Sequence, residues 1–156
     1  MRRFLCALVA LSGVLPTAHA EEFPPVSVFS DGDDEIAEAC GVSGASIVAA
    51  VESEFRHNRI PIAAANDQFG PGTINAFIYF VAGDITGAGG CAIAYNLELY
   101  HRQSIYDALK KKERMATIED CHDGGLIWGP SAGLQTRVND QYRNSVNICI
   151  SRYLKE

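Results

Sequence analysis

The sequence predicts an α+β domain in which two helices cover one face of a small sheet. Apolar residues recur every three or four positions between residues 43 and 58 and again from 130 to the carboxyl end, which is the period of an amphipathic helix. Between them, residues 91–99 alternate apolar and polar side chains, as a half-buried strand does. This order favours a two-layer sandwich: a three- to four-stranded, mostly antiparallel sheet covered on one face by an N-terminal-half helix and a long C-terminal helix.

The first 20 residues have the composition of an export signal. Met1-Arg2-Arg3 is a short basic start, the run from Phe4 to Leu15 is almost wholly apolar, and Ala18-His19-Ala20 is a small-x-small pattern that signal peptidase accepts. The apolar run is shorter than the roughly 20 residues that a membrane-spanning helix needs. We therefore expect a Sec-type signal peptide at 1–20, cleaved after Ala20, and a soluble periplasmic or secreted protein without membrane insertion.

The charge of the processed chain argues against some partners. Removing the leader takes away Arg2 and Arg3, so the remaining 136 residues carry 11 Lys and Arg against 19 Asp and Glu, a net charge of −8 with neutral His. Nucleic acids and anionic membranes bind basic surfaces without sequence specificity. The acidic balance therefore speaks against both as partners.

The cysteine count fits an oxidising compartment. Cys6 leaves with the leader, and Cys40, Cys91, Cys121 and Cys149 remain, an even number that predicts two disulfides. The spacings contain no Cys-x-x-Cys, so neither a redox motif nor a zinc knuckle is indicated. Four cysteines allow three pairings, of which we favour Cys40–Cys91 and Cys121–Cys149 because each links a helix region to a strand.

The amino-terminal part of the processed chain divides into a lead-in and a helix. Residues 21–34 are expected to form an extended lead-in with a short strand at 26–29, followed by one α+β domain at 35–156. Ser43 stands at an N-cap position, and the apolar helical spacing continues until His57-Asn58, where we expect the helix to end.

Several segments between the helices have strand composition. Residues 60–65 and 73–81 favour strands, the second being rich in β-branched and aromatic side chains. The run Lys110-Lys111-Lys112 indicates a solvated hairpin tip, from which residues 115–121 return beside 91–99. In the terminal helix, Val138 and Tyr142 are expected to face the sheet, whereas Asn139 lies on another face.

The motif Gly129-Pro130-Ser131-Ala132-Gly133 matches the Gly-x-Ser-x-Gly nucleophile elbow. An elbow serine needs a histidine later in the chain, and the histidines of the processed chain all precede it: His57, His101 and His122. The domain is also far smaller than an α/β-hydrolase. We interpret Pro130-Ser131 as the start of the terminal helix, with Ser131 as its cap and Trp128 as a buried apolar anchor.

Two ligand-binding patterns fail on their context. The segment 87–92 fits the Gly-x-Gly-x-x-Ala dinucleotide fingerprint, but a strand follows it instead of a helix, so we expect a hairpin loop. Asp31, Asp33 and Glu35 stand at the first three odd positions of a calcium-loop pattern. The pattern also requires a glycine and a final glutamate, and this chain has Ile36 and Val42 at those positions.

The triplet Cys121-His122-Asp123 does not form a catalytic pair by itself, because adjacent residues of a strand point to opposite faces. His101 on the neighbouring strand is a second candidate base. We interpret the triplet as a disulfide beside a glycine-rich corner, with Gly124-Gly125 as a bend or bulge.

Two function classes remain, and no catalytic, cofactor-binding or metal-binding residue is assigned. The first is a non-catalytic binding or interaction module of the bacterial periplasm or envelope, which binds an envelope or secreted protein through a sheet face, an edge or the hairpin at 101–115. The second is a small secreted hydrolase that uses paired carboxylates. Its candidate acids are Glu98, Glu119, Asp120 and Asp123. A cleft with converging carboxylates would favour the hydrolase, and a flat apolar patch ringed by polar groups the module.

Overall fold

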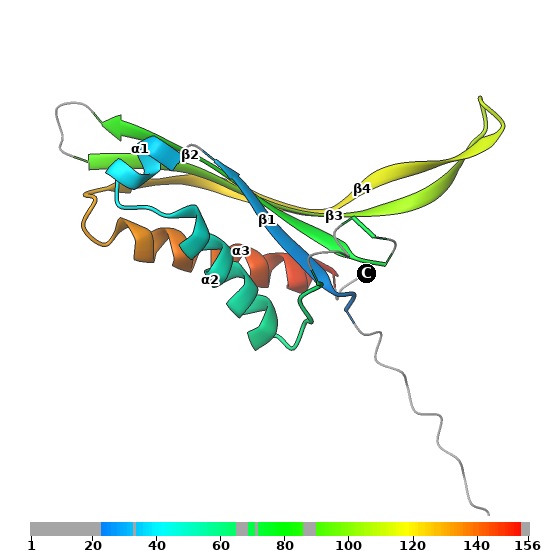
Figure 1. Ribbon diagram of the computed structural model, residues 1–156, viewed down its shortest axis with the longest axis horizontal. Coiled ribbons are helices and arrows are strands. Elements are labelled where there is room, and N and C mark those ends of the chain that lie inside the picture. Colours follow the sequence, from blue (N-terminus) through cyan, green and yellow to red (C-terminus); the bar gives the residue numbers. More distant parts are fainter. Residues whose placement is uncertain (1–22, 33, 65–68, 71, 86–89, 154–156) are drawn as a thin grey trace, which may run out of the picture.

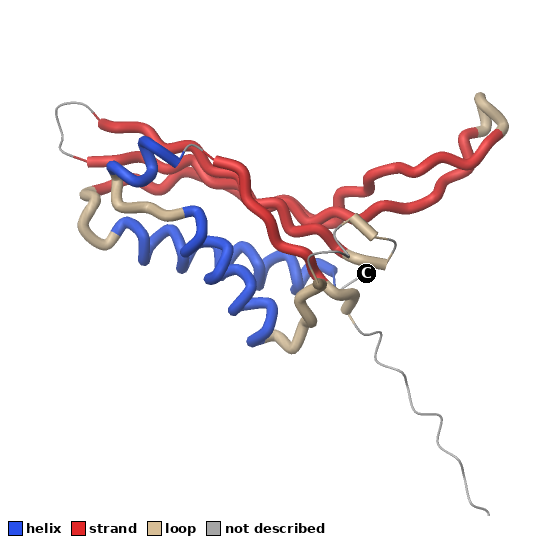
Figure 2. Tube along the Cα trace, viewed as in Figure 1, coloured by secondary structure: helices blue, strands red, loops and turns tan. Residues whose placement is uncertain are grey.

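The structure is a computed structural model that describes residues 23–32, 34–64, 69–70, 72–85 and 90–153 (Figure 1). Its strands form one mixed sheet in the order β1-β2-β3-β4, and the two longer helices lie together against one face of it (Figures 1 and 2). The predicted α+β sandwich is therefore confirmed. The predicted signal peptide lies outside the described residues, and none of the described helices is long and apolar enough to cross a membrane.

The elements follow one another in the order strand, two helices, three strands, helix. They are β1 (Val26–Gly32), α1 (Asp34–Ala39), α2 (Gly44–His57), β2 (Ile74–Ile85), β3 (Gly90–Asp107), β4 (Lys112–Gly129) and α3 (Leu134–Tyr153). The pairs β2–β3 and β3–β4 are antiparallel, whereas β1 runs parallel to β2.

The amino-terminal segments agree with the prediction in part. The strand expected at 26–29 is present within the edge strand β1, which continues to Gly32, whereas the described residues 60–64 of the expected strand 60–65 contribute only a bridge. Pro61 has no N–H to donate, and only a single bridge joins Ile62 to Val26. The Val26 N–H donates to the Pro61 carbonyl at 2.8 Å, and the Ala63 N–H donates to the Val26 carbonyl at 2.8 Å. This segment therefore caps the start of β1.

The predicted hairpin is much longer than its sequence signal. Strands β3 and β4 have 18 residues each and meet at a turn that Asp107 organises by accepting hydrogen bonds from the N–H groups of Leu109 (3.0 Å) and Lys110 (3.1 Å). The register shifts once: Leu99 faces Cys121 and Tyr100 faces Glu119, so Asp120 is the extra residue of a β-bulge.

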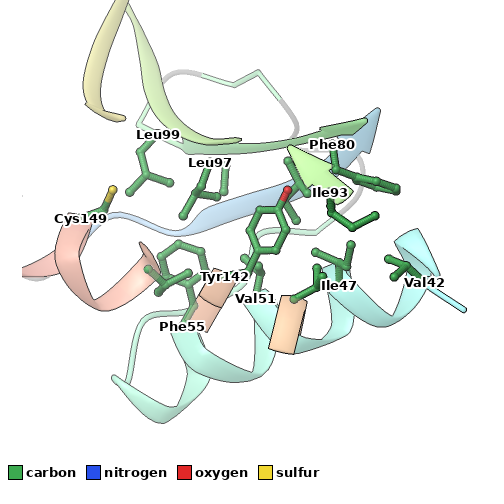
Figure 3. Close-up of a cluster of buried hydrophobic side chains, with 14 of the residues drawn as sticks. Val42, Ile47, Val51, Phe55, Phe80, Ile93, Leu97, Leu99, Tyr142 and Cys149 are labelled. Atoms are coloured by element: carbon green, nitrogen blue, oxygen red, sulfur yellow. The ribbon is translucent and has the colours of Figure 1, made fainter. Parts of the chain in front are cut away.

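The core lies between the helices and the sheet. Helix α2 begins after its N-cap Ser43, as predicted, and buries one apolar face. Helix α3 lies beside α2 in the same layer and also buries one face. Figure 3 shows Phe55 of α2 and Tyr142 of α3 directed toward Leu97 of β3, and all three side chains are fully buried. Val138 is buried as well, which confirms the predicted sheet-facing side of the terminal helix.

Tyr142 connects the two layers with a polar bond as well as an apolar ring. Its hydroxyl donates to the backbone carbonyl of Tyr79 in β2 at 2.8 Å, and its ring meets that of Tyr95 edge-on at 5.5 Å. Burial raises the pKa of Tyr142 above the ordinary value of 10.0, and a hydrogen bond with the Asn96 backbone acts in the opposite direction. A buried hydroxyl with backbone partners fixes the height and rotation of α3 on the sheet.

Two disulfides join the layers at separate places. Cys40, directly after α1, bonds to Cys91 at the start of β3, and Cys121 of β4 bonds to Cys149 of α3. The expected disulfides are thus present, in the pairing that the sequence favoured. They close loops across 51 and 28 residues, a length range in which a disulfide stabilises a fold by about 2–4 kcal/mol.

The buried face of α3 is testable by a charge substitution. Val138→Asp places an unpaired carboxylate in the core and should lower the free energy of unfolding by roughly 3 kcal/mol or more. Asn139 is not the neutral control that its helical position suggests, because its amide donates to Ser46 Oγ of α2 at 3.1 Å. The exposed Asn144→Asp is the matched control, and equal urea midpoints for the two variants would contradict the assigned face.

Tyr142→Phe tests the bond between α3 and the sheet. Loss of the hydroxyl leaves the Tyr79 carbonyl without this donor and should cost about 1–3 kcal/mol at neutral pH. Because the folded pKa of Tyr142 is raised, its contribution is complete below pH 10 and declines as the pH rises further, when the unfolded chain ionises first. The variant should therefore lose less stability than wild type between about pH 9 and 11; parallel alkaline curves would refute this role.

Candidate functional site

One face of the sheet has no helix over it. In β2 and β3 the residues that point toward the helices alternate with residues that point to the other side, which we call the open face. On this face β2 presents Tyr79 and Val81, which are both exposed, and β4 presents Leu126 and Trp128. The helix layer and the open face therefore occupy opposite sides of the same strands.

The open face carries an apolar strip, the open-face patch, across three strands. Val81, Ala94 and Leu126 stand in one row of the register, and Ala92 pairs with Trp128 in the next. The side chain of Trp128 is 71% exposed and that of Leu126 is 64% exposed. The patch consists of Tyr79, Val81, Ala92, Ala94, Leu126 and Trp128.

The shape of the patch follows from residue size. Small alanines occupy its middle strand, and larger side chains stand on the strands to either side, so β3 is the floor between Val81 on one side and Leu126 on the other. Gly83 and Gly124 extend the low floor, because neither has a side chain. The result is an apolar surface with small side chains along β3 and larger ones on the strands to either side.

Other residues cover the remaining part of the open face. The ring of Phe69 lies 5.4 Å from that of Phe29 in β1, and the Arg102 guanidinium lies 5.0 Å from the Phe69 ring centre. Phe29 also contacts Phe77 of β2, with ring centroids 5.2 Å apart. The aromatic residues at this end of the sheet therefore contact one another, although Phe69 itself remains partly exposed at 38%.

Polar groups border the patch. Asn96 donates from Nδ2 to Glu98 Oε1 at 2.7 Å, and Asp31 of β1 stands beside Tyr79 in the register. Farther along β4, His122 Nδ1 lies 4.0 Å from Glu119 Oε1. An apolar surface with a mainly acidic and amide border is the arrangement that we specified for a binding module.

The glycines of β4 serve a different purpose from the one predicted. Gly124-Gly125 lies within a continuous strand, and the bulge is at Asp120 instead. A Cβ on Gly125 would stand 3.1 Å from the Tyr95 hydroxyl oxygen, so glycine makes room for that ring on the helix side. Burial and the nearby charge of Asp123 raise the pKa of Tyr95, while hydrogen bonds with Gln141 and Ser145 oppose this rise.

The four candidate carboxylates are divided between different surroundings. Glu98 is on the open face, whereas Asp123 points toward α3 and accepts a 2.6 Å hydrogen bond from Ser145 Oγ. Asp120 accepts from His101, with Nδ1 at 2.9 and 2.8 Å from its two oxygens, and Glu119 is exposed. Glu98 and Asp123 stand on opposite faces of the sheet and do not converge on one substrate position.

The serine and cysteine motifs lie in architectural positions. Cys121 is in a disulfide, and His122 is on the opposite face of β4. Helix α3 begins at Leu134, three residues later than Ser131, so the predicted cap is wrong. Ser131 supplies its backbone carbonyl to the Leu134 N–H at 3.0 Å, and this bond forms part of the turn before the helix.

Two surface pockets have linings unlike an acid–base cleft. One of about 270 Å³ has Asp84 as the carboxylate in its lining, beside the Cys40–Cys91 disulfide and Ser131. The other, of about 120 Å³, lies beside His101 and Tyr153. Among the described residues, no group of three His, Cys, Asp or Glu side chains is placed to hold a metal ion. Asp33 and the 86–89 part of the dinucleotide-like segment lie outside the described residues.

Two continuous apolar runs in the sequence correspond to the strands that carry the patch. Residues 76–82 are apolar at nearly every position, and 126–128 are apolar at all three. A strand covered on one face requires apolar residues only at alternate positions. Continuous apolar runs therefore indicate either a second covering layer or apolar side chains exposed on the other face, and Leu126 and Trp128 are exposed.

No family model matches the chain, and no curated protein matches it. Among solved structures, a variant of the PelC dodecamer from Paraburkholderia phytofirmans has 14% sequence identity and a TM-score of 0.45, covering 82% of this chain and 88% of the PelC chain. Another PelC dodecamer structure from that organism has 12% identity and a TM-score of 0.40, with coverages of 85% and 88%.

The positions of Ser131 and Trp128 change what their substitutions should do. Trp128→Ala removes a mostly exposed ring and should alter the free energy of unfolding by less than about 1 kcal/mol, not by the 3–5 kcal/mol of a buried ring. Ser131→Ala should also be nearly silent, because the turn uses the backbone carbonyl. Thermal unfolding of both variants checks this, and a loss of several kcal/mol in Trp128→Ala would mean that the ring is covered.

Proposed function

We propose that this protein is an exported, non-catalytic interaction module of the bacterial periplasm or envelope, and that it binds an envelope or secreted protein through the open-face patch. The leader composition and the two disulfides support export to an oxidising compartment. The small α+β domain then serves as a rigid frame for the patch.

The observation that carries this proposal is the exposure of Trp128 and Leu126 on a sheet face without helices. Large apolar side chains gathered on a polar-bordered surface are typical of sites that bind other proteins. Tryptophan at the centre of an interface often contributes 2 kcal/mol or more to binding, which corresponds to about a thirtyfold change in Kd. The patch thus contains the residue type that is most typical of a binding hot spot.

The positions of the acids favour the module over the hydrolase. A carboxylate mechanism requires two acids at opposite sides of one scissile bond, about 5–10 Å apart. Asp120 and Asp123 are instead hydrogen-bonded to His101 and Ser145, and Glu98 is on the other face from Asp123. These bonds explain the acids as structural groups.

The sole tryptophan makes the proposal directly measurable. Protein purified after export is used as bait for envelope extracts, and each recovered protein is titrated while Trp128 fluorescence is recorded. A partner that covers the patch should shift the emission to shorter wavelength, because the indole leaves water. The double variant Leu126→Ser/Trp128→Ser should weaken recovery at least thirtyfold while keeping the wild-type melting temperature.

A matched control separates the patch from general surface apolarity. Ile36 is also exposed, at 41%, but belongs to α1, so Ile36→Ser should leave recovery unchanged. Retention of every recovered partner by the folded double variant would refute the patch as the binding surface. Release of reducing sugar or cleaved peptide by wild type, lost in Asp123→Asn, would instead favour the hydrolase.

A further inference from the structure

The end of the β3–β4 hairpin extends beyond the rest of the sheet as a two-stranded ribbon. Figure 1 shows it leaving the layered part of the molecule, with neither the helices nor the other strands beside its tip. Pairing continues to Asp107 and Lys112, so the ribbon is regular up to its turn. An isolated two-stranded ribbon is at best marginally stable in water, so the projecting end gains little stability from the rest of the sheet.

The ribbon differs in charge from the rest of the protein. Residues 101–118 contain five of the chain's 13 Lys and Arg residues but only two of its 19 Asp and Glu residues. The segment is therefore net positive by three, although the whole chain is net negative by six. The basic residues are Arg102, Lys110, Lys111, Lys112 and Arg114.

The two acids of the ribbon are already engaged within it. Asp107 accepts the turn hydrogen bonds and lies 3.5 Å from Arg114 Nε, and Glu113 accepts a 3.3 Å hydrogen bond from Ser104. Within the described chain, no ion pair involves the consecutive lysines 110–112. The positive charge at the tip is therefore available to an external anion.

Apolar side chains accompany this charge at the tip. Leu109 lies in the turn itself and is 96% exposed, and Tyr106 and Met115 are exposed on the strands below it. Tyr106 and Met115 are diagonal neighbours on one side of the ribbon, because Met115 pairs with Ser104 and Tyr106 with Glu113. The end of the hairpin therefore exposes apolar side chains and lysines next to each other.

We propose that the tip of this hairpin docks on a bilayer surface that carries anionic phospholipids. The lysine ammonium groups contact headgroup phosphates, and Leu109 enters the boundary between headgroups and acyl chains, with Tyr106 at the headgroup level. Basic residues attract an anionic membrane surface, and buried apolar side chains add to that attraction. The contact is peripheral and requires no spanning segment.

The basic tip can approach an anionic membrane although the chain as a whole is acidic. An acidic chain is repelled by an anionic membrane when its charge is treated as uniform, but repulsion falls off within about 8–10 Å at physiological salt. Strands of this length place the turn roughly 50 Å from the row of Trp128, given about 3.3 Å per residue. The basic tip therefore reaches the membrane while most of the acidic surface remains beyond screening distance.

Vesicle co-sedimentation tests the proposal with protein purified after export. Vesicles of phosphatidylglycerol and phosphatidylcholine should bind the protein at low salt, vesicles of pure phosphatidylcholine should not, and binding should fall as salt rises. Lys110→Gln/Lys112→Gln should weaken binding about thirtyfold, and Leu109→Ser about tenfold. Failure of anionic vesicles to bind wild type at low salt would overturn the proposal.

The matched control removes the same charge from the helix layer. Arg56→Gln/Arg143→Gln eliminates two arginines of α2 and α3, which form ion pairs with Glu52 and Asp140, and should leave vesicle binding within about twofold of wild type. If it weakens binding as much as the lysine pair does, the hairpin is not the contact. Equal binding of a soluble polyphosphate, insensitive to Leu109→Ser, would show a polyanion site and also overturn the membrane assignment.

A spectroscopic variant places the contact at the tip. Leu109→Trp in a Trp128→Phe background should shift its emission to shorter wavelength with anionic vesicles, whereas wild-type Trp128 should keep its emission. Vesicle binding by Trp128→Ser is expected to be unchanged, so failure of the patch proposal and failure of this one are separate results. Absence of the shift in the Leu109→Trp protein despite binding would refute insertion of the turn.

Discussion

The hydrogen bond from the Tyr142 hydroxyl to the Tyr79 carbonyl determines how the two layers of this fold meet. It joins the middle of α3 to β2, one of the two central strands, so the helix has one preferred position on the sheet. With α3 in place, α2 packs beside it, and the inward residues of the layered part of the sheet are covered, including Ile78, Phe80, Ile93 and Leu97. The same arrangement leaves the outward residues uncovered, and the open face is thus a direct consequence of where α3 binds.

Sequence periodicity predicted what depends on local pattern and on burial of one face. The helix at 44–57, the inward positions Val138 and Tyr142, and the presence of disulfides all follow from spacing that repeats within a segment. A strand at 26–29 was predicted and β1 contains it, but its parallel pairing with β2 was not predicted, because its partners lie about 48 positions later and no local pattern contains that pairing. Helix α1 was not predicted. Trp128 was taken for a buried anchor because hydrophobicity alone does not tell which face of a strand is covered.

Acidic residues lie mainly on the body of the molecule and basic residues gather on the hairpin. The amino-acid composition does not contain this division. The acidic residues are spread over the body, where Asp120, Asp123 and Asp140 are each held by a neighbouring side chain. The basic residues of the hairpin are adjacent in space because β3 and β4 pair in register to their ends. The net charge of the chain therefore does not describe the hairpin. The pairing of β3 with β4 brings Arg102 and Arg114 onto the same ribbon as the three lysines, so that this ribbon is positive although the chain is negative.

The β-bulge at Asp120 divides β4 into two mechanically different halves. On one side, the Cys121–Cys149 disulfide and the bond from Arg152 to the His122 carbonyl fasten the strand to the end of α3. On the other side, the base of the ribbon is held by the His101–Asp120 contact and by Arg102 over the Phe69 ring, and beyond it the two strands hold each other. Because the cross-links to α3 stop at residues 121–122, we expect bending of the hairpin to occur on the turn side of the bulge. A force on the turn would then tilt or fray the ribbon without disturbing the core.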